Sequence, residues 1–487
     1  MDILKSYVDE FNSQDEECYA NDVKNADALE WMRREVPIFE CPDKDIERAY
    51  YFRFWTYRKH IKTTEDGVVI SEFLPSVPWA GRHNTINAAA GHHIYEGRWL
   101  RGADKYLRSY VDFLLTPGEK SHAYSTWLAD AIYKYASVRG DFSFGEDFLE
   151  RLDAYYSEWE RTHGLSDGSF WSIDDRDAME YSASGTSRDG VVMRGIRPTL
   201  NSYMCADALA IARLADRLGN CALREKYEEK HRALKSFINE RLFDDGFYRA
   251  YHYARGEEPT EAVLRRGRSP RELIGYIPFM FEIPEGRDEC FDLLLDPEVF
   301  FTEYGPTTLE KTDERFLFAA EHECLWNGYV WPFATSQALT GLYLAARRSK
   351  SPKLKRSFIT LLSRYAGMHK RTREDGVVVS WIDEVIDPER GEWSSRRILR
   401  DLGWRPELGG YERGKDYNHS TFCDLVISGL AGASVEDGAA SFSPLIPDEW
   451  EYLRLSGVRL LGKDYEIIYD KTGERYSIGA GLTVREL

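Results

Sequence analysis

The chain of 487 residues is poor in cysteine and has no long hydrophobic run. Its seven cysteines are scattered, odd in number and never spaced as C-x-x-C, which argues against a disulfide framework or a zinc site. No apolar run approaches the roughly 20 residues that span a bilayer. The first residues, M-D-I-L-K-S-Y-V-D-E-F, lack the hydrophobic core of a signal peptide. We therefore expect no metal, no membrane partner and a cytoplasmic location.

Positive charge is also in the minority. The chain has 64 Lys and Arg against 82 Asp and Glu, for a formal net charge of −18, so a nucleic-acid or anionic-membrane partner is not expected. The sequence holds no P-loop, Rossmann fingerprint, G-x-S-x-G elbow or H-E-x-x-H motif. These absences argue against a nucleoside triphosphatase, a dehydrogenase, a serine hydrolase and a zinc protease, and no cofactor is expected.

Aromatic residues are plentiful by contrast. They make up 14% of the chain, and several tryptophans stand beside Gly, Asn, Arg or Glu rather than inside aliphatic runs: Trp79, Trp99, Trp171, Trp326 and Trp331. Packing in the core is one explanation for such residues. As a set they are also typical of the flat platforms on which sugar rings stack, because an apolar face there adjoins hydrogen-bonding groups.

Helical spacing of apolar residues dominates the chain and predicts helices at 100–115, 124–136, 148–162, 201–218, 223–239, 328–347 and 354–369. Charged amphipathic helices alternate with helices that follow a polar or aromatic loop and continue with small residues. Helices of the second kind start near Ser125, Asn201, Tyr329 and Ser420. This alternation predicts an all-α (α/α)6 barrel, with inner helices wrapped by outer ones. An irregular α-solenoid is the alternative, although solenoids keep a stricter repeat.

Strand signals are few. Hairpins are expected around Gly67–Phe73 and Gly376–Trp381, and the tail from Tyr452 alternates in strand fashion around a D-K-T-G turn at Asp470–Gly473. We expect the tail to form antiparallel strands on the barrel, with the Gly67–Phe73 hairpin as a candidate additional strand. The predicted division is a catalytic barrel over 1–440 and a β element over 441–487.

One polar loop is dense in charged side chains. Between Met179 and the helix near Asn201 it carries Glu180, Arg188, Asp189, Arg194 and Arg197, with glycines between them. Loops held by a rigid scaffold often carry chemistry. Two acids and three arginines in so short a segment are suited to gripping a polyhydroxylated ligand.

Several longer motifs resemble those of a known enzyme group. W-N-G-Y-V-W-P-F at Trp326–Phe333 resembles the W-R-G-P-x-W-P signature of (α/α)6-barrel glycosidases related to trehalase, processing α-glucosidase I and mannosylglycerate hydrolase, and E-L-I-G-Y-I-P-F at Glu272–Phe279 resembles a second motif. The segments Gly91–Leu100 and Glu412–Phe422 are similar to those of the mannosylglycerate-hydrolase-like branch. The resemblance covers roughly residues 79 to 430 and implies an inverting glycosidase.

Glycosidic hydrolysis needs two carboxylates across the scissile bond. Relatives place the acid in S-G-x-D, but the matching position here is Ser187 and the nearest carboxylate is Asp189, which we predict to be the general acid, with Glu180 as the alternative. Glu412 is the predicted general base, because glycines flank it and a helix follows, with Asp416 as the alternative.

Further residues of these motifs are candidates for binding the sugar: Trp79, Arg82, His83, Glu96, Arg98, Trp99, Trp127, Arg188, Arg194, Asn201, Glu323, Trp326, Asn327, Trp331, Tyr417 and His419. The adjacent His92 and His93 make a weak metal motif, since neighbouring side chains on a helix point to different faces.

The sequence thus predicts an exo-acting, inverting glycoside hydrolase that is a monomer or a homo-oligomer and acts on a small glycoside or an oligosaccharide end. A sugar epimerase or isomerase of the same barrel, with His83, His93 or His419 as acid and base, is the first alternative. A non-catalytic carbohydrate-binding protein is the second.

Overall fold

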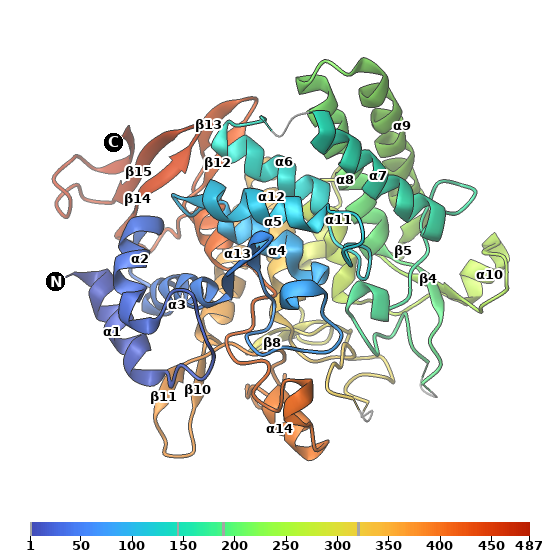
Figure 1. The fold of residues 1–487 in the computed structure, drawn as a ribbon, viewed down its shortest axis with the longest axis horizontal. Coiled ribbons are helices and arrows are strands. Elements are labelled where there is room, and N and C mark those ends of the chain that lie inside the picture. Colours follow the sequence, from blue (N-terminus) through green and yellow to red (C-terminus); the bar gives the residue numbers. More distant parts are fainter. Residues whose placement is uncertain (1, 144–145, 188–189, 319–321) are drawn as a thin grey trace.

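The computed structural model describes residues 2–143, 146–187, 190–318 and 322–487 and is dominated by helices (Figure 1). The α-helices are α1 (Ile3–Gln14), α2 (Ala28–Glu35), α3 (Lys44–His60), α4 (Ala90–Gly97), α5 (Ala103–Leu114), α6 (Leu128–Arg139), α7 (Glu146–His163), α8 (Pro198–Arg217), α9 (Cys221–Phe237), α10 (Glu261–Arg266), α11 (Ile277–Met280), α12 (Pro332–Ser349), α13 (Pro352–Gly367) and α14 (Ser395–Asp401). Each of the seven helices expected from the sequence is confirmed, with boundaries shifted by a few residues.

Strands form one larger sheet and several two-stranded pairs. The pairs join β2 (Ile61–Thr64) with β3 (Gly67–Ile70), β4 (Arg194–Ile196) with β7 (Tyr251–Tyr253), β5 (Phe243–Asp244) with β6 (Phe247–Tyr248), β8 (Phe301–Thr302) with β9 (Gly305–Pro306), β10 (Lys370–Thr372) with β11 (Val378–Ser380), and β12 (Ala433–Glu436) with β13 (Ala439–Phe442). The hairpins predicted near Gly67 and Gly376 are therefore confirmed as β2–β3 and β10–β11.

The C-terminal sheet is antiparallel in the order β1-β14-β15-β16, with β1 (Ile38–Glu40), β14 (Tyr452–Leu460), β15 (Lys463–Asp470) and β16 (Gly481–Glu486). The predicted antiparallel tail is confirmed. The strand that completes it is β1, whose Phe39 pairs with Leu455, and not the Gly67–Phe73 hairpin. The sheet consequently lies beside the N-terminal helices (Figure 1).

Helices α8 and α9 illustrate two kinds of helix. In α8, Pro198 fits the first turn because its missing N–H needs no partner there, and small residues such as Ala208 and Ala212 allow burial along nearly the whole helix. In α9, Asn220 caps the N-terminus by accepting the backbone N–H of Leu223, and only Tyr227 and Leu234 are buried. The sequence distinction between small-residue and charged helices is therefore a distinction between buried and exposed helices.

The buried helices contact one another in sequence order. Helix α4 packs against α6, α6 against α8, α8 against α11, α11 against α12, and α12 against the π-helical turn η9 (Leu425–Leu430). The first and last members are linked as well, because the Glu96 carboxylate on α4 accepts the backbone N–H groups of Phe422, Cys423 and Asp424. The segments before the N-termini of these helices carry the residues of the site described next.

No helix among the described residues combines the length and apolar character that crossing a bilayer requires.

Candidate active site

A buried arginine joins two carboxylates that come from distant loops. Arg413 Nε lies 3.0 Å from Glu384 Oε1, and Arg413 Nη1 lies 3.2 Å from Glu323 Oε1. Arg413 and Glu384 are almost fully buried, and Glu323 is 7% exposed. Because each carboxylate stabilises the guanidinium, the pKa of Arg413 is raised even though burial alone would lower it. We call Arg413, Glu384 and Glu323, together with the aromatic rings and carboxyl groups that surround them, the central cluster.

Aromatic rings surround the arginine of the central cluster. The Arg413 guanidinium lies 4.7 Å from the ring centroid of Trp404, 5.1 Å from that of Trp79 and 5.6 Å from that of Phe73. Such cation–π contacts are worth most where water is excluded. They hold the planar group between rings while its N–H groups are engaged by Glu384 and Glu323.

The backbone after Arg413 passes very close to the segment that carries Glu384. A Cβ added at Gly414 would collide with the carboxylate of Asp383, so only glycine permits this approach. Glu384 itself stands four residues after β11. The glycine in E-R-G-K therefore lets Arg413 meet Glu384, although the two lie far apart in sequence.

Glu72 is a third carboxyl group of the central cluster, and it is buried. It follows β3 and accepts a hydrogen bond from the Tyr417 hydroxyl. Burial raises the pKa of Glu72 to about 8, and the negative charge of Glu384 acts in the same direction. Glu72 Oε2 has no hydrogen-bond partner among the described residues. This carboxyl is therefore neutral at pH 7 and retains one oxygen for further contacts.

Glu180 is the fourth carboxyl group of the central cluster. It is half-buried in the loop before α8, and its backbone carbonyl accepts the N–H of Trp326 at 3.1 Å, which joins this loop to the Trp motif. Loss of hydration raises the pKa of Glu180 to about 8, and the charges of Asp175, Asp174 and Glu384 raise it further. Among the described residues, no arginine or lysine is a main cause that would lower the pKa of Glu180. A carboxylic acid in this setting holds its proton at neutral pH.

Tyr124 links the electrostatics of these groups. It lies just before α6, and burial raises the pKa of its hydroxyl, with the charges of Glu180 and Glu72 as the next causes. Similarly, the charge of Glu384 is felt by both Glu72 and Glu180. Glu384, which follows β11, is thus within electrostatic reach of two carboxyl groups, one from the segment before α4 and one from the segment before α8.

Two histidines and two tryptophans bring polar atoms without partners to the same region. Both ring nitrogens of His92 and of His419, and the indole Nε1 of Trp127 and of Trp326, are buried and have no hydrogen-bond partner among the described residues. Burial holds the pKa of both histidines well below its usual range, so both rings are neutral. Buried polar groups normally have partners. These groups are therefore available to ligand hydroxyls or water.

Ring contacts connect these side chains into one surface. The His92 ring lies 4.8 Å from Trp127 and 4.4 Å from Phe333, and Trp326 stacks on Trp331 at 4.4 Å. His419 continues the row, with its ring centroid 3.7 Å from that of Tyr417 and 6.0 Å from that of Trp331. The row therefore reaches Tyr417, the hydrogen-bond donor to Glu72.

Several residues predicted from the sequence lie in the central cluster or in this row: Trp79, Trp127, Glu180, Glu323, Trp326, Trp331, Tyr417 and His419. Glu72, Tyr124 and Glu384 were not among the site residues predicted from the sequence, and His92 was considered there only together with His93. Glu384 stands in S-W-I-D-E-V-I-D, directly after the predicted Gly376–Trp381 hairpin. An acid pair after an expected strand was the signal that could have found it.

Other predicted residues make contacts inside the fold. Glu96 accepts three backbone N–H groups, and the buried Asp424 accepts both Arg98 at 2.6 Å and the indole N–H of Trp99 at 2.7 Å. Asn201 is hydrogen-bonded to the backbone of Phe170. These side chains stabilise the packing of the helices whose N-termini lie next to the site.

The remaining predicted binding residues have partners of their own. Asn327 donates to the backbone carbonyl of Phe318 at 2.6 Å, and Arg194 lies over the ring of Trp171 at 4.1 Å. Arg82 pairs with Glu119, and His83 with Asp66, each at 2.6 Å. Arg188 lies outside the described residues.

The predicted catalytic residues are placed differently from one another. Asp189 lies outside the described residues, so the structure does not describe the predicted acid. Glu412 is ion-paired with Arg396, and its side chain is 31% exposed. Asp416 is buried and lies 2.7 Å from Lys59 Nζ. The predictions for these residues remain predictions, and Glu180, the alternative acid, is the one whose charge interacts with Glu384.

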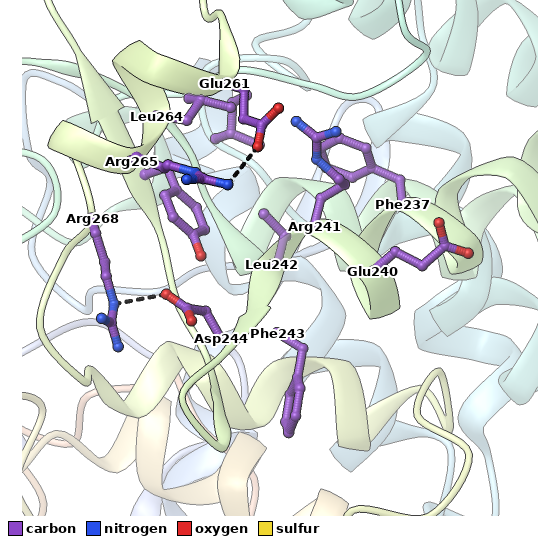
Figure 2. Close-up of a pocket in the computed structure, with 12 residues that line it drawn as sticks. Phe237, Glu240, Arg241, Leu242, Phe243, Asp244, Glu261, Leu264, Arg265 and Arg268 are labelled. Carbon is purple, nitrogen blue, oxygen red and sulfur yellow. Dashed lines mark hydrogen bonds and ion pairs between the residues drawn. The ribbon is translucent and has the colours of Figure 1, made fainter.

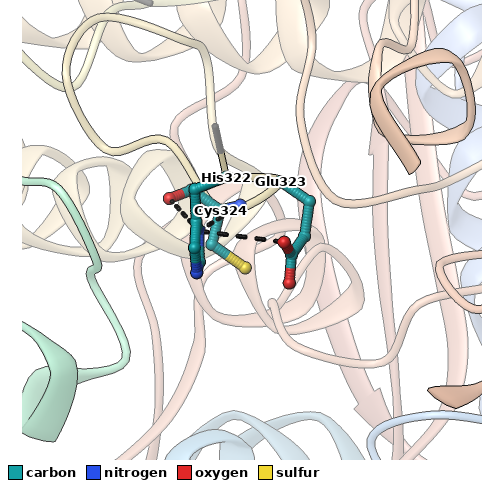
Figure 3. Close-up of side chains that lie close together, drawn as sticks. All are labelled: His322, Glu323 and Cys324. Atoms are coloured by element: carbon teal, nitrogen blue, oxygen red, sulfur yellow. Dashed lines mark hydrogen bonds and ion pairs between the residues drawn. The ribbon is translucent and has the colours of Figure 1, made fainter. Parts of the chain in front are cut away.

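His322, Glu323 and Cys324 lie together and offer three metal-ligand atoms (Figure 3). Arg413 already pairs with Glu323, and its Nη2 lies 3.7 Å from Cys324 Sγ. The Nδ1 of His322 accepts the backbone N–H of Cys324 at 3.0 Å. A guanidinium against two of the three ligands opposes a metal cation at this point.

A surface hollow of about 540 Å³ lies elsewhere, next to β5 and α10 (Figure 2). Its arginines include Arg265, paired with Glu261 at 2.7 Å, and Arg268, paired with Asp244 at 2.9 Å. None of the carboxylates of the central cluster lines it.

Comparison with known proteins identifies the family. Residues 82–420 match the model of the mannosylglycerate hydrolase MGH1-like glycoside hydrolase domain. The chain belongs to this family. The resemblance inferred from the sequence motifs is therefore confirmed, and membership of this family implies a carbohydrate substrate.

Solved structures support the same fold. A protein named sialidase is 32% identical with a TM-score of 0.87 over 99% of this chain, which spans only 42% of that protein's length. The GH63 mannosylglycerate hydrolase from Thermus thermophilus in complex with Tris is 11% identical with a TM-score of 0.51, covering 78% of this chain and 100% of that one. The GH78 rhamnosidase of Bacillus sp. GL1 is 12% identical with a TM-score of 0.54, covering 89% and 40%. At these low identities the last two show a shared fold alone.

Proposed function

We propose that this protein hydrolyses the glycosidic bond of a terminal sugar with inversion of configuration, with Glu180 as general acid and Glu384 as general base. The observation that carries the proposal is the contrast between these two carboxyls. Burial and neighbouring acids raise the pKa of Glu180 to about 8. Burial raises the pKa of Glu384 as well, but there the ion pair with Arg413 opposes the shift. Titratable groups whose environments differ in this way are suited to opposite roles in acid–base catalysis.

The acid role requires a proton at the pH of reaction, and Glu180 keeps one up to about pH 8. The base role requires an ionised carboxylate. Burial raises the pKa of Glu384, and the Arg413 guanidinium opposes that shift by stabilising the ionised form. In the inverting mechanism the acid protonates the leaving oxygen while the base takes a proton from the attacking water.

The architecture proposed for this chemistry is the (α/α)6 barrel. The contact sequence α4–α6–α8–α11–α12–η9, with Glu96 joining α4 to the segment before η9, supports an inner ring of six helical segments. The division into a catalytic unit at 1–440 and a β element at 441–487 is part of the same proposal. The exo mode is supported by the buried row of neutral polar groups, which suits one sugar ring better than a long chain.

Asp189 and Glu412 are the alternative acid and base. Asp189 keeps its place in the proposal because its segment corresponds to the S-G-x-D motif of relatives. Glu412 is one residue from Arg413, but its own carboxylate is paired with Arg396. Each can be tested beside the preferred residue.

The test is a panel of aryl α- and β-glycosides, including glucosides, mannosides, arabinosides and rhamnosides, with the released anomer followed by NMR. We expect one neutral glycoside to be cleaved with inversion, and Glu180→Gln and Glu384→Gln to reduce kcat/KM on it by at least about 100-fold. Asp189→Asn and Glu412→Gln serve as the comparison. Retention of configuration, or full activity in both glutamate variants, would contradict the proposal.

The epimerase alternative has one observation in its favour, namely the buried imidazoles of His92 and His419, which have no partners among the described residues. Of the histidines first considered, His93 is bonded to the Tyr110 hydroxyl and the Asn418 carbonyl, and His83 is bonded to Asp66. Loss of sugar epimerisation in His419→Ala, with both carboxylate variants active, would favour this alternative. Sugar binding that survives loss of both carboxylates, with no turnover of any glycoside, would favour the non-catalytic one.

A further inference from the structure

We propose that the site accepts glycosides whose sugar and adjoining group carry no carboxylate, and discriminates against acidic glycosides such as uronides, sialosides and glyceric acid glycosides. This inference rests on the proposed function, because it concerns the substrate of the same site. The observation behind it is the balance of charge in the described part of the central cluster, where four carboxyl groups face a single guanidinium.

The four carboxyl groups are Glu72, Glu180, Glu323 and Glu384. Among the described residues of the cluster, the one guanidinium is that of Arg413, and it is engaged by Glu384 and Glu323 together. The His322 ring lies 3.9 Å from the Glu323 carboxylate. Both Glu384 and Glu323 lie at ion-pair distance from this one guanidinium, so the carboxyl groups of the described cluster outnumber its guanidinium groups. Above about pH 8 the cluster becomes more negative, because the pKa of both Glu72 and Glu180 is about 8.

A second cation lies nearby but is committed elsewhere. Arg53 donates to the backbone carbonyl of Ser420 at 2.5 Å and to the Tyr365 hydroxyl at 3.2 Å. Burial raises the pKa of Glu96, and the charge of Arg53 opposes that shift. Arg53 therefore serves the interior of the fold and offers no free partner for a substrate carboxylate.

The rest of the binding surface is neutral. Its groups without partners among the described residues include the imidazoles of His92 and His419, which burial keeps uncharged, and the indole N–H groups of Trp127 and Trp326. Such groups exchange hydrogen bonds with hydroxyls at little cost. A carboxylate brought among these described groups would lose its hydration without gaining a cation from them, and placing a charge in that situation is expensive.

This inference differs from what the names of two similar proteins would suggest. A sialidase and a mannosylglycerate hydrolase are named for acidic glycosides, and similarity of fold alone would suggest the same for this chain. The charge of the central cluster points to neutral sugars instead, as in the structural neighbour named rhamnosidase.

The experiment compares matched pairs on the wild-type protein at pH 6 to 7. Aryl glucosides are paired with aryl glucuronides of the same anomer, and mannosylglycerol is paired with mannosylglycerate, so that the leaving groups are alike within each pair. An aryl sialoside is added as a further acidic substrate. We expect kcat/KM for the neutral member of a pair to exceed that of the acidic member by at least about 100-fold, since like-charge contacts cost several kcal/mol. An acidic member that is cleaved as fast as its neutral partner, or faster, would overturn the inference and leave the proposed function intact.

Charge is tested directly by Glu323→Gln, which leaves Arg413 with one carboxylate partner. The ratio of neutral to acidic kcat/KM should fall by at least about 10-fold in this variant, whereas a merely structural role for Glu323 would lower both values alike. The matched control is Glu119→Gln, which removes an arginine-paired carboxylate at the surface and should leave the ratio unchanged. An unchanged ratio in Glu323→Gln would count against the electrostatic explanation.

Measurements of sugar binding distinguish a failure of this inference from a failure of the proposed function. Calorimetry with free glucose, mannose, rhamnose and arabinose is compared with glucuronic acid, N-acetylneuraminic acid and glycerate. If no glycoside is cleaved but neutral sugars bind and acids do not, the inference stands and the hydrolase proposal fails. If the acids bind at least as well as the neutral sugars, or if neither class binds or reacts, the inference fails.

Discussion

Glu384 and Glu412 each pair with an arginine, yet the two pairs lie in different surroundings. The Glu384–Arg413 pair is almost fully buried, ringed by Trp79 and Trp404, and coupled to further carboxyls. The Glu412 side chain is 31% exposed, and Arg396 is its partner. Contact with arginine therefore does not identify a catalytic carboxylate. Burial, and the presence of other acids within electrostatic reach, are better criteria.

The first prediction uses this contrast and has the largest expected effect. Glu384→Gln should reduce kcat/KM on the best glycoside by about 10³-fold, because the water loses its general base, while Glu412→Gln should change it by less than about 10-fold. Steady-state kinetics on the same substrate give both values. Azide, a small external nucleophile, should restore part of the rate in Glu384→Gln.

Thermal unfolding of the two variants is the control, since Glu384→Gln also leaves a buried arginine with fewer partners. Activity is compared well below both Tm values. The opposite ranking, with Glu412→Gln inactive and Glu384→Gln active, would return the base role to the residue predicted from the sequence.

The second prediction concerns Glu180 and pH. Because the pKa of Glu180 is raised to about 8, the acid is protonated below that pH and is lost above it, so kcat/KM should fall as pH rises through about 8. Glu180→Gln should remove this limb of the profile. It should cost at least about 100-fold on a glycoside with a poor leaving group, and much less on a nitrophenyl glycoside, which needs little protonation.

Asp189→Asn is the matched comparison for this experiment. If that variant loses the basic limb while Glu180→Gln keeps it, Asp189 is the acid and Glu180 is not. The dependence on leaving group separates both outcomes from general damage to the site, which would affect all substrates alike.

Much of the fold could be predicted from the sequence because it depends on local patterns. Small-residue helices such as α8 and charged helices such as α9 differ along their whole length, and each has its boundary signals, so their existence and burial followed from spacing alone. The pairing of β1 with β14 could not be predicted, because residues 38–40 are too few to show a period and their partner lies more than 400 residues away.

The site was predicted in part for a similar physical reason. The loops were identified, since glycines, tryptophans and charges gather in them, and Glu180, Glu323 and Tyr417 were among the candidates. Which carboxylate enters the cluster depends on long-range contacts. Glu384 meets Arg413 only because Gly414 allows the two segments to approach, and no local pattern encodes that meeting.

The third prediction extends the comparison to Asp416, the alternative base from the sequence. Asp416 and Asp15 both lie 2.7 Å from Lys59 Nζ, and these three side chains are buried. Asp416→Asn should lower the free energy of unfolding by about 3 kcal/mol, because a buried charge loses one partner. Asparagine tolerates the positive φ of 60° at this position, so backbone strain should not contribute.

Denaturant unfolding measures this loss, and kcat/KM below the transition should stay within about 3-fold of wild type if Asp416 only supports the fold. A loss of activity of about 100-fold without a loss of stability would instead place Asp416 in the chemistry. Asp375→Asn, at an exposed pair with Arg373, is the control and should change stability by less than about 1 kcal/mol.

The smallest effect is expected at Arg82, which the sequence motifs suggested as a sugar-binding residue. Its side chain is 45% exposed and is shared between Asp66 and Glu119. Exposed pairs of this kind contribute about 0 to 1 kcal/mol, since water and salt screen them. Arg82→Gln should therefore lower the free energy of unfolding by less than about 1 kcal/mol and leave kcat/KM within about 3-fold, with any stability difference shrinking in high salt. If the Michaelis constant instead rose by about 10-fold or more (about 1.4 kcal/mol) at unchanged stability, substrate would have to reach Arg82, and the binding surface would extend beyond the central cluster.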